Sequence, residues 1–150
     1  MKKLLFIVCM LFAFSNVNAQ TKEETIAWIK EKLEKYTHYS SIQISECEII
    51  LGAKQKSEGL SYLEYKYTMP LKNIDTLKIG LLISKLNNFK YDSKYFNGTQ
   101  NKYEDEKSER RSMVTLVDFD KYETNLNERF LKAIKHLTSF CWKEEKKEAF

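Results

Sequence analysis

The sequence predicts an α+β fold in which an N-terminal helix, an antiparallel curled sheet of four or five strands and a C-terminal helix follow one another. Apolar residues recur at steps of three and four near both ends of the mature chain, as in amphipathic helices. Between these ends, apolar and polar residues alternate in short runs, as in a sheet with one face in water. The C-terminal helix is therefore expected to pack on the sheet.

Residues 1–19 have the composition of a secretory signal peptide, with two lysines, an eleven-residue apolar run and a Val-Asn-Ala site. The run is too short to anchor the chain, because a transmembrane helix needs about 20 apolar residues. Cys9 lies inside this run rather than behind it, so we do not expect lipidation. The mature chain is expected to start at Gln20, to be periplasmic or secreted, and to have no stable membrane anchor.

The mature chain is expected to form a single domain over residues 20–150. Its 131 residues are enough to bury roughly two-thirds of the surface of the unfolded chain. Lys2 and Lys3 leave with the signal peptide, so the net charge falls from +4 to +2, with both signs interspersed. This weak bias predicts neither a nucleic acid nor a membrane surface as partner.

The first helix is predicted over residues 22–36. Thr21 and Glu24 have the spacing of a capping box, in which each side chain bonds to the backbone N–H of the other. Trp28 lies about 160° from the middle of the apolar stripe at 100° per residue, so it is either packed at the edge of the fold or exposed as part of a binding surface. The stripe consists of Ile26, Ile29, Leu33 and Tyr36.

Strands are predicted in four or five segments. In the first, alternation slips by one residue near Ser45 and Glu46, which indicates a bulge or a bend. The third is expected to point Leu77, Ile79, Leu81 and Ile83 inward. The last has two fairly apolar faces, which favours a central place in the sheet. The segments are 42–51, 60–68, 76–84, a weaker one at 89–96, and 113–119.

Two connections stand out between these strands. Asn97-Gly98 is a strong turn signal. Residues 101–111 carry four acids and four bases, and we expect them to form a solvated loop.

Tyr62 and Lys66 lie on the polar face of the strand at 60–68. Aromatic side chains on a wet sheet face can stack on sugars or anchor a partner protein. The alternative is that tyrosine occurs there because it favours strands and has a polar tip.

Cys47 and Cys141 are the two cysteines of the mature chain, and both belong to inward-facing sets. In an exported protein such a pair permits a disulfide. The alternative is two buried thiols that act as small apolar residues.

The closing helix, residues 125–142, has an apolar stripe roughly 120° wide at 100° per residue. Its run Asn127–Cys141 resembles the C-terminal signature of small exported Bacteroidetes proteins of unassigned function, and residues 69–75 resemble a connection in the same family. Matching positions are Arg129, Ala133, His136, Leu137 and Cys141, whereas Glu128 replaces a small residue. The resemblance covers about half of the mature chain. It implies a PH-like curled sheet plugged by the terminal helix, and it leaves the chemistry open.

No group of residues predicts catalysis, a metal or a cofactor. His136 and Cys141 are five residues apart and diverge by about 140° on a helix, so they cannot share one ion. The contiguous acids of residues 104–106 lack the alternate spacing of a calcium loop. No Gly-rich loop precedes a helix.

These observations favour a non-catalytic exported domain that binds a protein, peptide or glycan through a sheet face or an edge strand. The alternative is a small periplasmic hydrolase or ligand-processing enzyme. A deep pocket with convergent polar groups and shifted pKa values would favour the enzyme, and a shallow aromatic patch would favour the binding domain.

Overall fold

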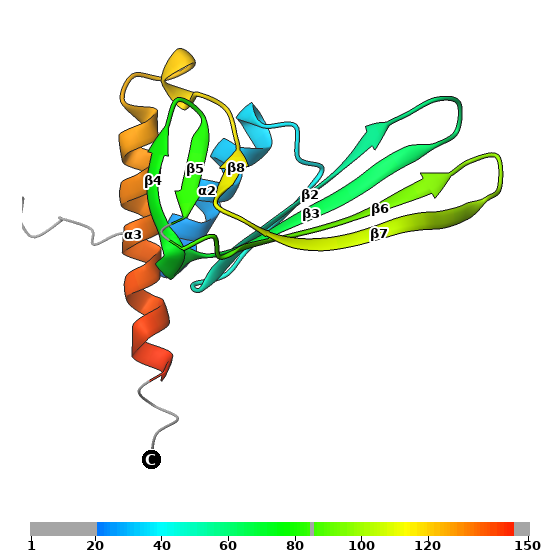
Figure 1. The fold of residues 1–150 in the computed structure, drawn as a ribbon. Coiled ribbons are helices and arrows are strands. Elements are labelled where there is room, and N and C mark those ends of the chain that lie inside the picture. Colours follow the sequence, from blue (N-terminus) through cyan, green and yellow to red (C-terminus); the bar gives the residue numbers. More distant parts are fainter. Residues whose placement is uncertain (1–20, 85, 146–150) are drawn as a thin grey trace, which may run out of the picture.

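The structure is a computed structural model that describes residues 21–84 and 86–145 (Figure 1). The expected signal peptide lies outside the described residues. Two long helices, α2 (Lys22–Tyr36) and α3 (Leu126–Glu145), enclose a series of strands along the chain. The strands are β1 (Ser41–Ile44), β2 (Glu48–Lys56), β3 (Tyr62–Pro70), β4 (Ile74–Lys78), β5 (Leu81–Ser84), β6 (Phe89–Asn97), β7 (Lys102–Arg111) and β8 (Met113–Thr115). Two short 3-10 turns, η1 (Leu71–Asn73) and η2 (Phe119–Lys121), complete the set.

The α+β class is confirmed, but the strands form two antiparallel sheets. The five-stranded sheet has the order β1-β2-β3-β6-β7, and the three-stranded sheet has the order β4-β5-β8. The helices and the small sheet lie together at one end, and the long strands β2, β3, β6 and β7 extend away from them (Figure 1). Part of the large sheet therefore projects beyond the helices (Figure 1).

Helix α3 supplies much of the core, as its apolar stripe predicts. Phe130, Ile134 and Leu137 are almost fully buried. They lie on the helix that contacts α2, η1, β4 and η2. At the start of the fold, the Thr21 and Glu24 side chains form the expected capping box of α2. Helix α2 thus begins at its predicted cap, and helix α3 buries its predicted apolar face.

The slip in the first predicted strand is a chain reversal rather than a bulge or a bend. Strands β1 and β2 form a hairpin, in which Ile44 pairs with Ile49. The Ser45 side chain stabilises the turn by accepting hydrogen bonds from the backbone N–H groups of Cys47 and Glu48, at 3.3 Å and 3.2 Å. A tight turn shifts the alternation by one residue just as a bulge does, so the sequence pattern could not separate them.

The segment 76–84 is also a hairpin, and the single inward-facing strand expected there is wrong. Ile79 and Gly80 form its two-residue turn, with φ of 48° and 76°. Ile79 is 82% exposed instead of buried, and Leu82 faces the core in place of Leu81 and Ile83. A Cβ at Gly80 would lie 2.9 Å from backbone atoms of residues 117 and 118, so only glycine fits this approach. A two-residue hairpin turn usually has Asn or Asp before the glycine, and because Ile79 stands there the sequence gives no turn signal.

Two further expectations are corrected at the sheet edges. Residues 102–111 are strand β7 rather than a loop, and they pair with β6 across the predicted Asn97-Gly98 turn. Their charges belong to an edge strand, where charged side chains discourage pairing with other chains. The last strand, β8, has only three residues and lies at the edge of the small sheet, not at the centre of a sheet.

A disulfide joins Cys47 to Cys141, with their Cα atoms 5.1 Å apart. Cys47 lies in the turn between β1 and β2, and Cys141 lies near the end of α3. The bridge therefore fastens the closing helix to one edge of the large sheet.

Candidate functional site

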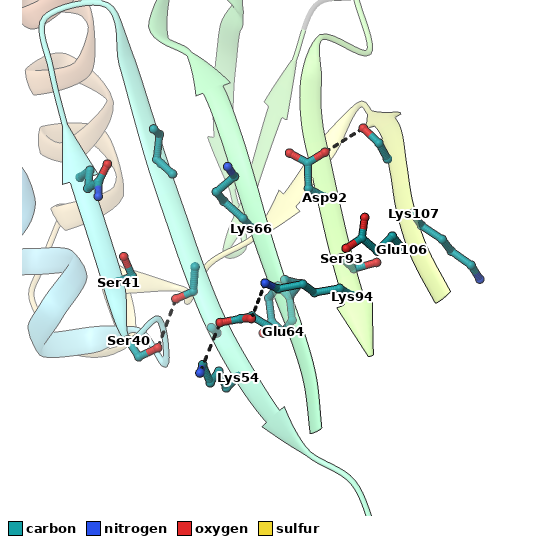
Figure 2. Close-up of a pocket in the computed structure, with 16 residues that line it drawn as sticks. Ser40, Ser41, Lys54, Glu64, Lys66, Asp92, Ser93, Lys94, Glu106 and Lys107 are labelled. Atoms are coloured by element: carbon teal, nitrogen blue, oxygen red, sulfur yellow. Dashed lines mark hydrogen bonds and ion pairs between the residues drawn. The ribbon is translucent and has the colours of Figure 1, made fainter. Parts of the chain in front are cut away.

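The outward-facing side of the five-stranded sheet carries an open trough of about 810 Å³. Strand pairing places Gly52, Lys66, Asp92 and Ser108 in one row across four strands. The adjacent row contains Lys54, Glu64 and Lys94. Since every second residue of a strand points to the same face, both rows share one face. We call this the outer-face trough (Figure 2).

The hollow of the trough arises from small residues. Gly52 lies in the interior of the nine-residue strand β2, and Ser41 lies opposite it on β1. A Cβ at Gly52 would be 3.4 Å from the Ser41 Cβ, an ordinary contact, so packing does not require glycine there. Glycine in a strand interior weakens the strand and often marks a close approach of a ligand or another backbone. Gly52 therefore keeps the trough open at a cost to strand stability.

Glu64 is held between two lysines at one end of the trough. Its carboxylate lies 3.3 Å from Lys54 Nζ and 3.2 Å from Lys94 Nζ (Figure 2). Partial burial would raise the pKa of Glu64, but the hydrogen bonds and charges of the two lysines outweigh it and lower the pKa below its usual value. Glu64 is thus kept ionised.

Asp92 has a similar environment on β6. Its carboxylate accepts a 2.7 Å hydrogen bond from Ser108 Oγ and lies 3.0 Å from Lys90 Nζ. Burial favours a higher pKa for Asp92, yet these contacts and the nearby charge of Lys66 lower it. Glu64 and Asp92 therefore both have little tendency to take up a proton near neutral pH.

Lys66 projects from the centre of the trough, next to Gly52 (Figure 2). It is exposed, and within the described residues its Nζ has no ion pair within 4 Å. Its neighbour Asp92 is instead paired with Lys90. The predicted binding residue Lys66 thus presents a cation that the fold itself does not neutralise.

Tyr62, the second predicted binding residue, belongs to an aromatic cluster that continues the trough toward the tips of the long strands. Its ring stacks on Phe96 with centroids 4.9 Å apart, and its hydroxyl lies 3.1 Å from that of Tyr103. Tyr103, which is 43% exposed, donates a 3.3 Å hydrogen bond to Glu64. The hydrogen bond with Tyr62 is the main cause that raises the pKa of Tyr103 to about 12. The aromatic cluster of Tyr62, Phe96 and Tyr103 is thus connected to the trough through Glu64.

Trp28, the third predicted binding residue, is not part of this surface. It lies on α2, is partly buried against the core, and has its ring centroid 6.3 Å from that of Phe130. Lys32 Nζ and the Arg129 guanidinium lie over the same ring, at 5.8 Å and 5.6 Å. Trp28 borders a separate shallow hollow of about 420 Å³ between the helices, together with Arg129, Lys132, Ala133 and His136.

The opposite face of the large sheet carries tyrosines that serve packing. Tyr39 donates a 2.7 Å hydrogen bond to the Thr115 carbonyl and meets Tyr65 and Tyr67 edge-on. Burial is the main cause that raises the pKa of Tyr39. Arg111 covers the Tyr91 ring at 3.7 Å and donates to the Tyr67 hydroxyl. These polar tips are satisfied within the fold, so we do not assign them to a site.

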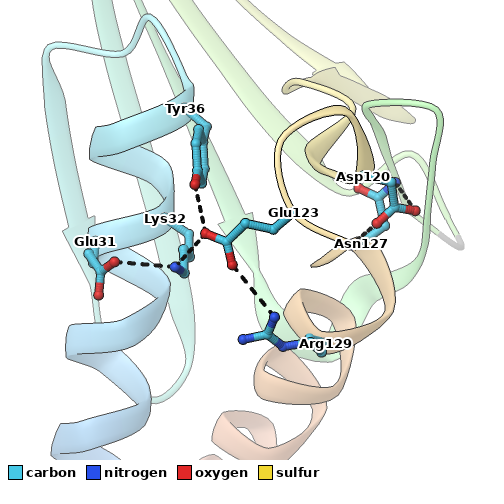
Figure 3. A network of polar contacts seen from close by, with 7 residues as sticks. All are labelled: Glu31, Lys32, Tyr36, Asp120, Glu123, Asn127 and Arg129. Carbon is cyan, nitrogen blue, oxygen red and sulfur yellow. Dashed lines mark hydrogen bonds and ion pairs between the residues drawn. The ribbon is translucent and has the colours of Figure 1, made fainter. Parts of the chain in front are cut away.

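The densest polar network of the helical end also has a structural role. Glu123 accepts hydrogen bonds from Lys32 Nζ at 2.8 Å and from Tyr36 Oη at 2.6 Å, and lies 3.5 Å from Arg129 Nη1 (Figure 3). It thereby links α2 to α3. Asn127 fixes the entry to α3 by bonding both carboxylate oxygens of Asp120, at 2.9 Å and 3.0 Å.

Glu123 makes the free energy of unfolding depend on pH in the acidic range. The hydrogen bonds from Lys32 and Tyr36 lower the pKa of Glu123 from 4.5 to about 2. Its stabilising contribution is therefore complete above pH 4.5 and is lost as the pH falls toward 2, where the folded state must take up the proton. We expect Glu123→Gln to flatten the dependence of the unfolding free energy on pH between 5 and 2, as measured by urea unfolding. Glu34→Gln, on the exposed side of α2, is the control, and an equal flattening there would contradict the assignment.

Comparisons with family models, curated proteins and solved structures find no match to this chain. Within the described residues, no helix is long and apolar enough to cross a membrane. Nor does this part of the chain contain a group of three or more His, Cys, Asp or Glu side chains able to hold a metal ion. The site must therefore be interpreted from its own chemistry.

Of the residues singled out in the sequence, Lys66 lines the trough and Tyr62 belongs to the aromatic cluster beside it. Alternation along a single strand placed Tyr62 and Lys66 on the polar face. Asp92, Phe96 and Tyr103 join them through pairing of β3 with β6 and of β6 with β7. The Asn97-Gly98 turn was a usable signal, because a hairpin around it brings Tyr103 opposite Phe96.

Proposed function

We propose that this protein is an exported, non-catalytic binding domain whose outer-face trough holds its ligand. The observation that carries the proposal is Lys66, which has no ion pair among the described residues and projects beside the hollow at Gly52, in a trough where Glu64 and Asp92 are each paired with other lysines. The hollow exists although packing does not require glycine at position 52, and the exposed ammonium group beside it is able to bind a polar or anionic group of a ligand. The Cys47–Cys141 disulfide supports an oxidising, extracytoplasmic location.

The face of the sheet is a better binding surface than its edge. Strand β7, the long edge, carries charged side chains along most of its length and an irregularity near residue 94 of its partner strand. Charged residues and bulges are devices that prevent another strand from pairing. An added β-strand is therefore not the mode of binding that we propose.

The acid–base state of the trough supports binding over hydrolysis. A general acid must hold a proton near the working pH, which requires a raised carboxyl pKa. Glu64 has a lowered pKa because Lys94 and Lys54 bond it, and Asp92 has a lowered pKa because Ser108 and Lys90 bond it. Such carboxylates accept hydrogen bonds from a ligand but are poor proton donors.

Filling the hollow tests this proposal. Gly52→Thr is expected to weaken binding at least about tenfold for whichever of three probes binds best: tetragalacturonate, cellotetraose or a tetraglutamate peptide. The unfolding free energy should stay the same or rise by up to about 1 kcal/mol, because threonine favours strands. Calorimetric titration and urea unfolding measure the two quantities, and Gly52→Ala should give a smaller loss of affinity.

Two results would contradict the proposal. Unchanged affinity in a folded Gly52→Thr protein would place the binding site elsewhere. A shorter product in the mass spectrum of an incubated probe, lost in a Glu64→Gln or Asp92→Asn protein, would favour the hydrolase instead.

A further inference from the structure

The composition of the trough bears on the class of its ligand. Protein interfaces are depleted in Lys, Glu, Asp and Ser and enriched in aromatic side chains, Met and Arg. The trough has the reverse composition: it is lined mainly by lysines, carboxylates and serines, with Ile50 and Ala53 among the few apolar contributors. A folded protein partner would have to remove many of these charges from water, and the free-energy cost of this desolvation would be offset by little apolar burial.

The polar groups of the trough match hydroxyl groups instead. Glu64 lies between Lys54 and Lys94, so acceptor and donor groups lie side by side. A sugar hydroxyl both donates and accepts, and it can bond a carboxylate and an ammonium group together. Gln43, whose amide also donates and accepts, lines the same trough.

The aromatic cluster supplies the apolar element that sugar binding also needs. The Tyr62, Phe96 and Tyr103 rings lie on the same face as the trough, and Tyr103 is linked to Glu64. Lys66 and Tyr62 are four residues apart on one strand, which separates them by about 13 Å along the sheet. This length suits a short extended chain rather than a single small molecule.

The charge of the trough favours an acidic ligand. Lys54 and Lys94 share the single carboxylate of Glu64, and Asp92 has Lys90 as its direct partner. Lys66 is left without an ion pair among the described residues. Four lysines line the trough (Lys54, Lys66, Lys94 and Lys107) against three carboxylates (Glu64, Asp92 and Glu106), so the cationic groups outnumber the carboxylates by one.

We infer that the ligand of the outer-face trough is an acidic oligosaccharide, with a carboxylate bound by Lys66 and a sugar ring at the aromatic cluster of Tyr62, Phe96 and Tyr103. This inference rests on the proposed function, because it assigns a ligand class to the same site. Lys66 forms an ion pair with the ligand carboxylate, and the paired carboxylates and lysines of the trough form hydrogen bonds with the sugar hydroxyls.

The test is calorimetric titration of the mature protein with tetragalacturonate, neutral cellotetraose and a tetraglutamate peptide. Tetragalacturonate should bind at least about tenfold more tightly than either other probe, and Lys66→Gln should reduce its affinity by about tenfold or more. Lys78→Gln removes the same charge from the exposed face of β4 and should leave the affinity within about twofold. A circular dichroism spectrum identical to that of the unsubstituted protein shows that each variant is folded.

The outcomes separate this inference from the proposed function. If cellotetraose or the peptide binds as tightly as tetragalacturonate, and Gly52→Thr abolishes that binding, the acidic glycan is wrong and the trough remains the site. Equal losses for Lys66→Gln and Lys78→Gln would show nonspecific attraction of charge and overturn the inference. Failure of all three probes to bind would overturn both.

Discussion

Replacement of both Cys47 and Cys141 by Ser is expected to lower the free energy of unfolding by about 4 kcal/mol. The disulfide joins residues 94 positions apart in the sequence. In the chain-entropy model, a cross-link that closes so long a loop restricts the unfolded chain strongly and stabilises the fold by about 4–5 kcal/mol. Urea unfolding of the double variant and of the oxidised protein measures the difference.

Reduction provides an independent control for this prediction. The unsubstituted protein in the presence of a reductant should unfold at the same urea concentration as the Cys47→Ser, Cys141→Ser variant. A difference below about 1 kcal/mol between the oxidised protein and the variant would mean that the bridge contributes little to the fold.

Truncation of Leu137 to Ala is expected to cost about 2–5 kcal/mol of unfolding free energy. Leu137 is fully buried on the inward face of α3, and its removal leaves a cavity besides the loss of apolar burial. A loss of this size is a large share of the stability of a typical domain. Thermal or urea unfolding measures it, and Phe130→Ala should behave similarly because Phe130 is equally buried.

Lys132 is the matched control on the same helix. Its side chain is 74% exposed and pairs with Glu128 one turn earlier, a contact worth under about 0.5 kcal/mol on a helix surface. Lys132→Ala should therefore cost under about 0.5 kcal/mol. Comparable losses for Lys132→Ala and Leu137→Ala would show that α3 faces the other way.

Local signals in the sequence were sufficient for the helices and for the class of the fold. The capping box of Thr21 and Glu24 acts within one helical turn, and the stripe of α3 is a property of one segment. The segments predicted near β3 and β6 also correspond to strands, and in β3 the alternation of apolar and polar residues runs along most of the strand. None of these features depends on a partner distant in the sequence.

The errors concern turns and pairing, which depend on contacts between distant segments. Ile79 occupies a turn position that usually favours Asn or Asp, so the hairpin of β4 and β5 gave no recognisable turn signal. The charged residues of β7 resemble a loop until β6 is placed beside them. In both cases the sheet, rather than the segment itself, determines the conformation.

The candidate site shows the same division. The polar face of one strand singled out Tyr62 and Lys66, and position on a helix singled out Trp28, which packs beside Phe130, one of the two alternatives that the sequence left open. The role of Gly52 became visible only through its neighbours, because a glycine has no side chain that alternation can place. A trough formed by five paired strands requires their register, which a sequence pattern does not give.

We propose that the outer face of the five-stranded sheet binds the ligand. Mapping of backbone amide NMR shifts during titration of the mature protein with tetragalacturonate tests it most directly. We expect the largest shifts at Gly52, Lys66, Asp92 and Tyr103, with little change around Trp28. Shifts concentrated at Trp28, Arg129 and His136, in the hollow between the helices, would contradict the claim.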